Sequence, residues 1–164
     1  MTLFLIRHGA TDWTEAGRFN GMTDVPLNET GRAQARQLET ELAGMSFVSV
    51  LSSDLVRALE TAELAVGTAA VDGRLRELDF GELEGKTWDE CSPDTQKSLL
   101  AFDSFVAPGG ESVEALTERV RDLVGGLGPG DHLLFTHGGV IRLLLRAAGR
   151  DERVRPGQLV QLES

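Results

Sequence analysis

Two histidines and two arginines of this chain stand where apolar runs end or where a helix begins. Arg7 and His8 follow one apolar run, His137 follows another, and Arg57 falls in the first turn of a predicted helix. A neutral imidazole is a nucleophile and a protonated one supplies positive charge, whereas arginine offers forked donors that suit phosphate. These residue types together predict a pocket for a tetrahedral dianion.

The runs before these residues are typical of short buried strands. Leu3-Phe-Leu-Ile is wholly apolar, and Phe47–Leu51 and His132–Thr136 are comparable in length and largely apolar. In an open α/β sheet, ligands bind outside the carboxyl ends of the strands. If these three strands are parallel neighbours, the two histidines and two arginines meet at one edge. Gly9 would let the backbone turn sharply there.

Apolar positions spaced by three and four residues predict the helices that flank this sheet. Residues 10–26 and 68–92 lack a steady period and are expected to be mostly irregular. Helices beginning after Ser53 and His137 would direct backbone N–H groups at a bound anion. The expected helices run from the N-cap Asn28 to a stop at Gly44 with Met45 still on the apolar stripe, from Leu55 to Gly67, within 93–108, from the N-cap Ser112 to Leu127, and from Val140 to Ala148.

The alternation of strands and helices predicts an α/β fold. We expect a three-layer α/β/α sandwich with a mainly parallel sheet, and Leu159–Leu162 as a last strand at its edge. A length of 164 residues suits one domain with a core of its own.

Composition restricts the partners and the compartment. A formal net charge of -10 argues against nucleic acid and against an anionic membrane surface. The lone cysteine, Cys91, excludes an internal disulfide and favours a reducing compartment. No leader-like segment or long apolar run is apparent, so we expect a cytoplasmic protein.

Each candidate residue also has an interpretation without function. Arg57 could pair with an acid on a helix surface, and His132 beside Asp131 could be a solvated strand start. The acidic run from Glu77 to Glu84 would ordinarily be a solvated loop. Four suitable groups at three strand ends are harder to dismiss together, and phosphate-loop, Gly-x-Ser-x-Gly and paired Cys/His metal patterns are missing from the sequence.

An ordered set of motifs resembles the histidine phosphatase family, which includes cofactor-dependent phosphoglycerate mutases. The resemblance covers most of the chain and implies a phosphoglycerate mutase-like fold, a single domain over residues 1–164, and a short cap over the site from residues 75–112. The matching stretches are Leu5-Ile-Arg-His-Gly9 with Thr11, Trp13, Gly17, Arg18 and Gly21, then Asp24–Gly31, Ser52–Thr61, Leu75–Gly85, Pro108–Ser112 and Thr136–Gly139.

The resemblance also implies roles for individual residues. His8 corresponds to the nucleophile that forms a phosphohistidine, and Glu77 to the proton donor to the leaving group. Arg7, Arg57 and His137 correspond to the groups that hold the phosphoryl oxygens. Thr14 departs from the family's frequent Asn and has a shorter reach. Further substrate or phosphate contacts are expected at Gly9, Thr14, Asn20, Gly21 and Gly138.

The implied activity is a metal-independent phosphomonoesterase that acts on a small phosphorylated metabolite. Arginines would supply the electrostatic stabilisation that a metal gives elsewhere, so no cofactor and no metal are expected. The segment Glu77–Gly85 is similar to the phosphatase branch, especially to α-ribazole-5'-phosphate phosphatases. Phosphoglycerate mutase, protein phosphohistidine phosphatase and a non-catalytic phosphometabolite-binding domain are the alternatives. A monomer or homodimer is expected.

Four acidic residues compete for the role of proton donor: Glu77, Asp79, Glu82 and Glu84. Glu82 and Glu84 lie among glycines, where solvent should keep them ionised. Glu77 precedes the apolar Leu78, and burial beside an anionic phosphoryl group would favour its protonated form.

Overall fold

The computed structural model describes residues 1–163 and has the expected α/β architecture. Three short 3₁₀ helices, η1 (Gly73–Leu75), η2 (Gly81–Leu83) and η3 (Trp88–Glu90), lie between β3 and α4. The strands and α-helices are β1 (Thr2–Arg7), α1 (Asp12–Glu15), α2 (Glu29–Leu42), β2 (Ser49–Ser52), α3 (Val56–Val66), β3 (Ala70–Val71), α4 (Pro93–Ala101), α5 (Val113–Gly125), β4 (Asp131–Thr136), α6 (Gly138–Ala147) and β5 (Leu159–Glu163).

The sheet has the strand order β3-β2-β4-β1-β5. β3, β2, β4 and β1 are parallel, and β5 pairs antiparallel with β1 at the edge. β4 lies between β1 and β2, and its register sets Arg7 opposite Thr136. The three strands that precede the candidate residues are therefore neighbours, as the sequence predicted.

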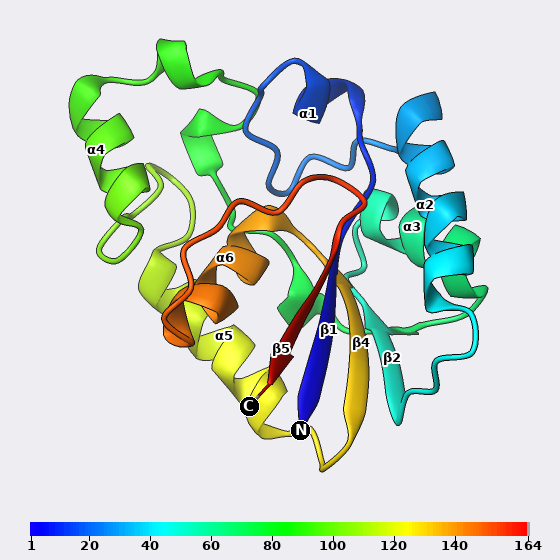
Figure 1. Ribbon diagram of the computed structural model, residues 1–164. Coiled ribbons are helices and arrows are strands. Elements are labelled where there is room, and N and C mark those ends of the chain that lie inside the picture. The colour runs from blue at the N-terminus through cyan, green and yellow to red at the C-terminus, as the bar shows by residue number, and fades with distance from the viewer. Residues whose placement is uncertain (164) are drawn as a thin grey trace.

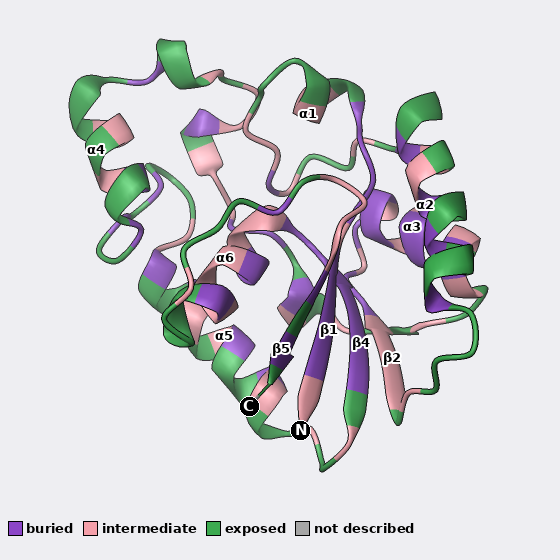
Figure 2. Ribbon diagram, viewed as in Figure 1, coloured by how far each residue is buried: buried purple, intermediate pink, exposed green. Residues whose placement is uncertain are grey.

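Helices cover both faces of this sheet, with α2 and α3 on one side and α5 and α6 on the other (Figure 1). Alternate strand residues serve the two layers: Phe4 and Ile6 pack with α2 and α3, whereas Leu3 and Leu5 pack with α5 and α6. Figure 2 shows the resulting burial along β1 and β4. Such strands cannot carry a charge in their middle, so their polar residues gather at the ends.

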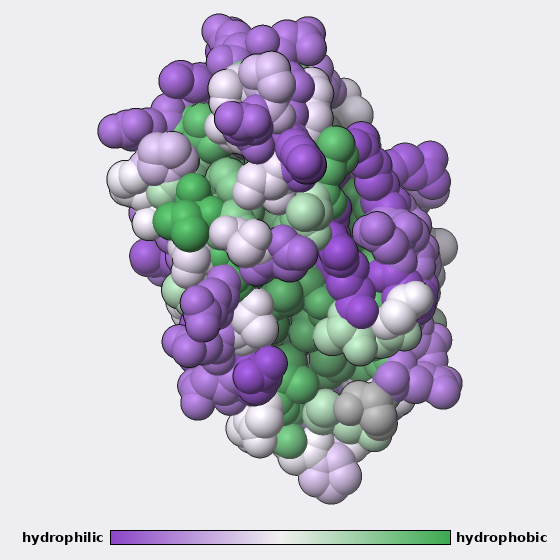
Figure 3. All heavy atoms as spheres, turned by 90° about the vertical axis from the view of Figure 1, so that its left-hand side faces the viewer, coloured by the Kyte–Doolittle hydropathy of each residue, from purple (hydrophilic) through white to green (hydrophobic). Residues whose placement is uncertain are grey.

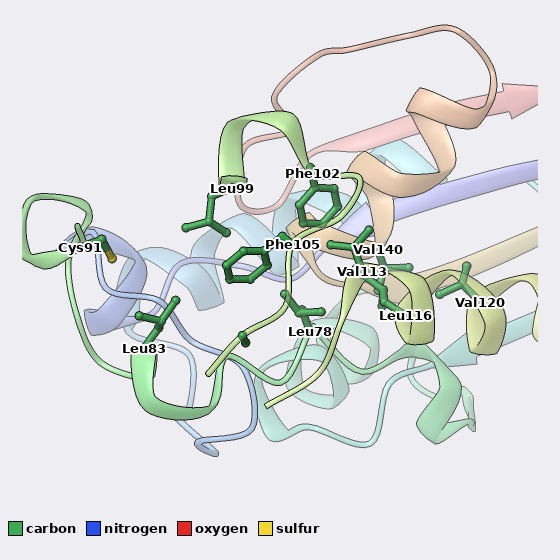
Figure 4. Packing of buried hydrophobic residues seen from close by; sticks show 11 residues of the cluster. Leu78, Leu83, Cys91, Leu99, Phe102, Phe105, Val113, Leu116, Val120 and Val140 are labelled. Atoms are coloured by element: carbon green, nitrogen blue, oxygen red, sulfur yellow. The ribbon is translucent and has the colours of Figure 1, made fainter. Parts of the chain in front are cut away.

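Residues 75–112, hereafter the cap segment, have a small core of their own. Leu83, Leu99, Phe102 and Phe105 are buried in it and lie close together in Figure 4. This core continues into α5 and α6 through the buried side chains of Val113, Leu116, Val120 and Val140. The cap segment is thus attached to the α5–α6 side of the sheet by apolar contact.

The helix boundaries differ from the predictions by one or two residues in α5 and α6, which span Val113–Gly125 and Gly138–Ala147. Three further differences are more informative. One helical turn, α1, interrupts the expected loop of residues 10–26, because Thr11 and Thr14 form a reciprocal capping box. α2 begins after Asn28 as expected but ends at Leu42, so Met45 lies outside it and is 38% exposed. α3 begins after Leu55, which makes no side-chain cap, although the preceding Ser52, Ser53 and Asp54 are of residue types that commonly cap helices.

His132 also differs from the expectation. It is 2% exposed rather than solvated, because its ring lies within hydrogen-bond distance of the Ser49 hydroxyl (2.7 Å) and the Gly128 carbonyl (2.9 Å). Pairing of β2 with β4 covers this strand start, which single-strand reasoning does not anticipate.

The outer surface is mixed in character. Figure 3 looks onto the side of α4, α5 and α6 and shows hydrophobic side chains in hollows between hydrophilic ones. Among residues 1–163, no helix combines the length and the apolar character needed to cross a membrane.

Candidate active site

The two histidines come together at the carboxyl ends of β1 and β4. His8 directly follows β1, and its backbone N–H donates to the Thr136 carbonyl at the end of β4 (3.0 Å). His137 directly follows β4 and is the N-cap of α6. Their ring centroids are 5.2 Å apart, and both side chains are buried. The parallel register alone brings them together.

One hydrogen bond defines the tautomer of His8. Its Nδ1 lies 2.7 Å from the Gly9 carbonyl, which can only accept, so Nδ1 carries the proton. Burial, and after it the positive charges of Arg57 and Arg7, hold the pKa of His8 well below its ordinary value. The ring is therefore neutral near pH 7 and keeps a lone pair on Nε2, which makes that atom a nucleophile.

His137 is held by a serine that precedes α3. Its Nε2 lies 2.8 Å from the Ser53 hydroxyl, while its Nδ1 is buried without a partner among residues 1–163. Ser53 also accepts a hydrogen bond from the Leu55 amide (3.3 Å). Burial lowers the pKa of His137 well below its ordinary value, with smaller contributions from Arg57 and His8. The ring is thus oriented from one side and has one nitrogen unused.

Arg57 is fully buried in the first turn of α3. Its Nη2 donates to the carbonyls of Asn20 (3.0 Å) and Gly21 (2.8 Å), and its Nη1 donates to that of Thr23 (3.1 Å). Its Nε has no partner in the described chain. Burial lowers the pKa of Arg57, opposed by the charges of Glu77 and other acids, but a guanidinium stays cationic. Arg57 therefore holds the preceding loop and keeps one donor free.

Arg7 is anchored in a similar way. Its Nη1 donates to the Val154 carbonyl (2.8 Å), in the loop before β5, and its Nε is buried and unpartnered within residues 1–163. Burial lowers the pKa of Arg7, whereas the charge of Glu77 raises it. Two guanidinium groups thus have fixed directions, because backbone carbonyls of separate loops hold them.

Glu77 reaches the same place from the cap segment. It is 7% exposed, and its Oε2 accepts a hydrogen bond from the Gly139 amide (2.9 Å) at the start of α6. Its Oε1 accepts one from the Leu78 amide (2.8 Å). A Cβ at position 139 would collide with Oε1, so this approach requires glycine. Glu77 therefore lies against the helix that follows His137.

Arg7, His8 and Glu77 line one pocket of about 330 Å³, whereas the fully buried Arg57 and His137 are not part of its wall. The wall also includes Thr14, Asn20, Gly138 and Gly139. Buried polar atoms are normally hydrogen-bonded, and each exception calls for an explanation. Around this pocket the unpartnered atoms are the Nε of Arg7, the Nε of Arg57, the Nδ1 of His137 and the side-chain amide of Asn20. Three of the four belong to cationic or protonatable side chains. An oxyanion with several acceptors would satisfy the N–H donors among them, but not the Oδ1 of Asn20.

Several residues that were predicted to contact the substrate or its phosphate make hydrogen bonds to other protein groups instead. The Gly9 amide donates to the Thr61 hydroxyl (3.0 Å), and a Cβ on Gly9 would strike Gly31. The Thr14 hydroxyl donates to the Thr11 carbonyl (3.0 Å), although the residue lines the pocket. The Gly21 amide donates to Glu84 (2.8 Å). These residues shape the loop beside the pocket and do not direct their main donors into it.

The expected arrangement of helix N-termini is wrong in detail. The amide of Val56 at the start of α3 donates to Asp24 (2.8 Å), and that of Leu55 to Ser53. At the start of α6, the Gly139 amide donates to Glu77. Side chains thus occupy these donors, and the helix starts contribute through the residues they position.

The acidic neighbours of Glu77 have different surroundings. Glu82 is exposed, as predicted, but Glu84 is not a solvated carboxylate. Glu84 accepts hydrogen bonds from the amides of Gly21 (2.8 Å) and Thr23 (2.9 Å) and has a buried second oxygen. It stabilises the loop that Arg57 also binds.

Sequence reasoning missed four supporting residues: Ser53, Thr61, Arg119 and Gly139. Thr61 lies one helical turn after Arg57 and links its carbonyl (2.7 Å) to the Gly9 amide, so the spacing was a usable signal. The Gly-Gly pair after His137 was another. Arg119 donates to the carbonyls of Arg74, Arg76 and Glu77, which the sequence does not reveal because more than forty residues intervene.

Comparison with known proteins gives concordant matches. The sequence model of the histidine phosphatase superfamily (branch 1) matches residues 3–159. Phosphoglycerate mutase-like protein 4 of Arabidopsis thaliana is 34% identical over 169 residues, which cover 94% of this chain and 71% of that protein.

Solved structures resemble the chain over nearly its whole length. The crystal structure of phosphoglycerate mutase from Thermus thermophilus superposes with a TM-score of 0.94 at 47% identity, covering 99% of this chain and 93% of the other. A candidate alpha-ribazole-5'-P phosphatase from Escherichia coli K-12 superposes with a TM-score of 0.82 at 30% identity, covering 98% and 89%.

Proposed function

Because the chain belongs to the histidine phosphatase superfamily (branch 1), we propose that it is a phosphomonoesterase acting through a phosphohistidine on a small phosphorylated metabolite. The observation that carries this proposal is the hydrogen bond from His8 Nδ1 to the Gly9 carbonyl. It leaves the Nε2 lone pair available in a pocket that Arg7 also lines, and the buried side chains of Arg7, Arg57 and His137 each keep one nitrogen without a partner within residues 1–163.

In the first step, Nε2 of His8 attacks phosphorus in line with the ester oxygen. The N–P bond forms as the P–O bond breaks, and a protonated Glu77 gives its proton to the departing oxygen. The two arginines and His137 stabilise the charge that spreads over the equatorial oxygens. The free alcohol leaves, and Glu77 remains as a carboxylate.

In the second step, water attacks the same phosphorus from the side that the alcohol has left. Glu77 accepts the proton of that water, the N–P bond breaks, and the electron pair returns to Nε2. Inorganic phosphate departs with Glu77 protonated again, so the cycle consumes only water. The same carboxylate serves as acid and then as base because the attacking water takes the position that the departing alcohol has left.

Phosphoglycerate mutase activity is the second candidate. It is favoured by the name of the Thermus thermophilus structure, which is 47% identical to this chain. A mutase uses the same phosphohistidine but passes the phosphoryl group to another hydroxyl of its substrate. The Escherichia coli structure named for alpha-ribazole-5'-P supports that ester as one candidate substrate for a hydrolase.

Phosphate release from a panel of esters in EDTA tests the proposal. If the chain is a phosphatase, we expect metal-independent release of phosphate from p-nitrophenyl phosphate and ribazole phosphate. If it is a mutase, it should isomerise 3-phosphoglycerate without net release of phosphate. His8→Ala should abolish acid-labile phosphoenzyme in quenched-flow labelling. A labelled phosphoenzyme that persists in this variant would assign the nucleophile elsewhere, and binding without turnover in the wild type would indicate a non-catalytic domain.

A further inference from the structure

A second hollow of about 480 Å³ opens directly beside the candidate active site. It shares part of its wall with the first pocket, including Phe19, Phe80 and Arg142. A group attached to a phosphate in the first pocket would therefore extend into this hollow. We call it the side hollow. Its apolar wall consists of Phe19, Phe80, Trp88, Leu99, Leu100 and Phe102.

The wall is assembled from Phe19 and from rings and branched side chains of the cap segment. The rings of Phe19 and Phe80 are tilted by 41° with 5.1 Å between centroids, and both pack on the core of the cap segment. Trp88 and Leu100 stand at the opening, 38% and 56% exposed. Leaving large apolar side chains in water forgoes stabilisation, so a cluster of them beside a reactive centre indicates a binding surface.

The guanidinium group of Arg142 supports this wall. Arg142 donates to the carbonyls of Leu99 (2.9 Å) and Leu100 (2.7 Å) at the end of α4, and its guanidinium lies 4.7 Å from the centre of the Phe102 ring. A cation at a helix C-terminus stabilises the last carbonyls. Arg142 thereby holds α4 over the hollow.

The acidic residues at the rim are paired with arginines. Asp151 and Glu152 line the side hollow together with Arg153. Asp151 is 3.9 Å from Arg142, and Glu152 is 2.6 Å from Arg150. Both carboxylates are therefore paired with arginines, so the rim has no excess of negative charge and its charges do not select among leaving groups.

We propose that the side hollow binds the alcohol part of the substrate and selects an aryl or arylalkyl group over a short alkyl group. This inference rests on the proposed phosphatase function, since it assigns the leaving-group subsite of the same reaction. A flat apolar group would cover Phe80 and Trp88 while its phosphate occupies the first pocket. Burying a ring there accounts for a preference of about 10–100-fold over a short alkyl ester.

Phenethyl phosphate and ethyl phosphate test this selection, because both leaving groups are primary alcohols and differ mainly in the ring. We expect kcat/KM to favour phenethyl phosphate by about 10–100-fold. Trp88→Ala with Leu100→Ala should reduce that ratio by about tenfold, since the two exposed side chains form the opening. Val106→Ala is the matched control: Val106 is 62% exposed in the same cap segment but lies outside both pockets, so the ratio should stay unchanged.

Calorimetry with two phosphonates separates this inference from the proposed function. 3-Phenylpropylphosphonate and propylphosphonate mimic the two esters and bind without reacting. Tighter binding of the phenyl compound, lost in the Trp88→Ala Leu100→Ala variant, would support the subsite even if neither ester turned over. Equal turnover of both esters with equal phosphonate binding would overturn it.

Discussion

The candidate site has a strand-end half, formed by Arg7, His8 and His137, and a cap half, formed by Glu77 and the rest of the cap segment. The two halves are held in place by different contacts. Arg7, His8 and His137 follow strands whose neighbours bond to them in continuous parallel register. The cap segment has only short helices, and arginines from other elements bind its carbonyls: Arg119 those of residues 74, 76 and 77, Arg142 those of 99 and 100, and Arg146 that of Ala101 (2.6 Å).

This contrast separates two tasks. The group that handles phosphate must be preorganised, because catalysis by fixed cations depends on donors that do not reorient during the reaction. The part that meets the leaving group can vary without disturbing the sheet, since loops and short helices tolerate changes in sequence and length. We infer that the strand ends determine the reaction, whereas the cap segment determines the substrate.

Glu77→Gln tests whether the cap half also supplies chemistry, and it has the largest expected effect. Glutamine keeps the shape and can still accept from the Gly139 amide, but it cannot donate or take up the proton. We expect kcat for phenethyl phosphate to fall about 10²–10⁴-fold. p-Nitrophenyl phosphate should lose less in the first step, and burst kinetics should reveal accumulated phosphoenzyme, because water activation is also lost.

Glu82→Gln is the control for this change, since Glu82 is an exposed acid of the same segment. Its kinetics should equal those of the wild type. A larger alkyl-specific loss for Glu82→Gln than for Glu77→Gln would assign the proton donor to the other carboxylate.

Gly139→Ala tests the contact between the two halves. The added methyl group would collide with Glu77 Oε1 and displace the carboxylate, although alanine suits the helix itself. A displacement near 1 Å can cost about 10²-fold in rate, so we expect a kcat loss of about 10–100-fold with the fold intact. Gly125→Ala is the matched control, because nothing lies within 4 Å of a Cβ there. Equal kinetics of both variants would show that the function of Glu77 does not depend on its close contact with Gly139.

Ser53→Ala tests the strand-end half alone. The change removes the hydroxyl 2.8 Å from His137 Nε2, and a net hydrogen bond of about 1 kcal/mol corresponds to roughly a fivefold effect. We expect vanadate inhibition to weaken by about that factor and its pH dependence to shift. Ser52→Ala removes a neighbouring buried hydroxyl that bonds only the Ser53 carbonyl in the described structure, so it should alter stability without moving the inhibition profile.

Acid should destabilise the strand-end half through its histidines. Burial lowers the pKa of His8 and of His137, so the unfolded chain binds more protons than the folded one below pH 6.5. Stability is thus full above that pH and is lost as pH falls, by about 1.4 kcal/mol per pH unit for each histidine. Urea unfolding between pH 7 and pH 5, without phosphate or sulfate, measures this slope.

His8→Gln should reduce that slope by about one histidine's share, because one of the two neutral rings is removed. An unfolding free energy that is the same at pH 7 and pH 5 in the wild type would contradict the buried, neutral state of both rings.

Much of the fold followed from local patterns. Arg7 and His8 at the end of β1, the Asn28 cap of α2 and the Ser112 cap of α5 were all predicted, because apolar runs and capping side chains act within a few residues. Leu55 as the residue before α3 was not, since three better capping residues precede it. The chain uses Ser53 for His137 instead, which is a long-range requirement.

The sequence by itself determined the strand ends and the identity of the reactive groups, because these depend on hydrophobic runs and on the chemistry of single side chains. Only the tertiary structure decided the tautomer of His8, the need for glycine at position 139 beside Glu77, the burial of His132 and of one carboxylate oxygen of Glu84, and the apolar wall of the side hollow. Each of these arises from contacts between segments far apart in the chain, and no local periodicity encodes which carbonyl or ring will lie opposite.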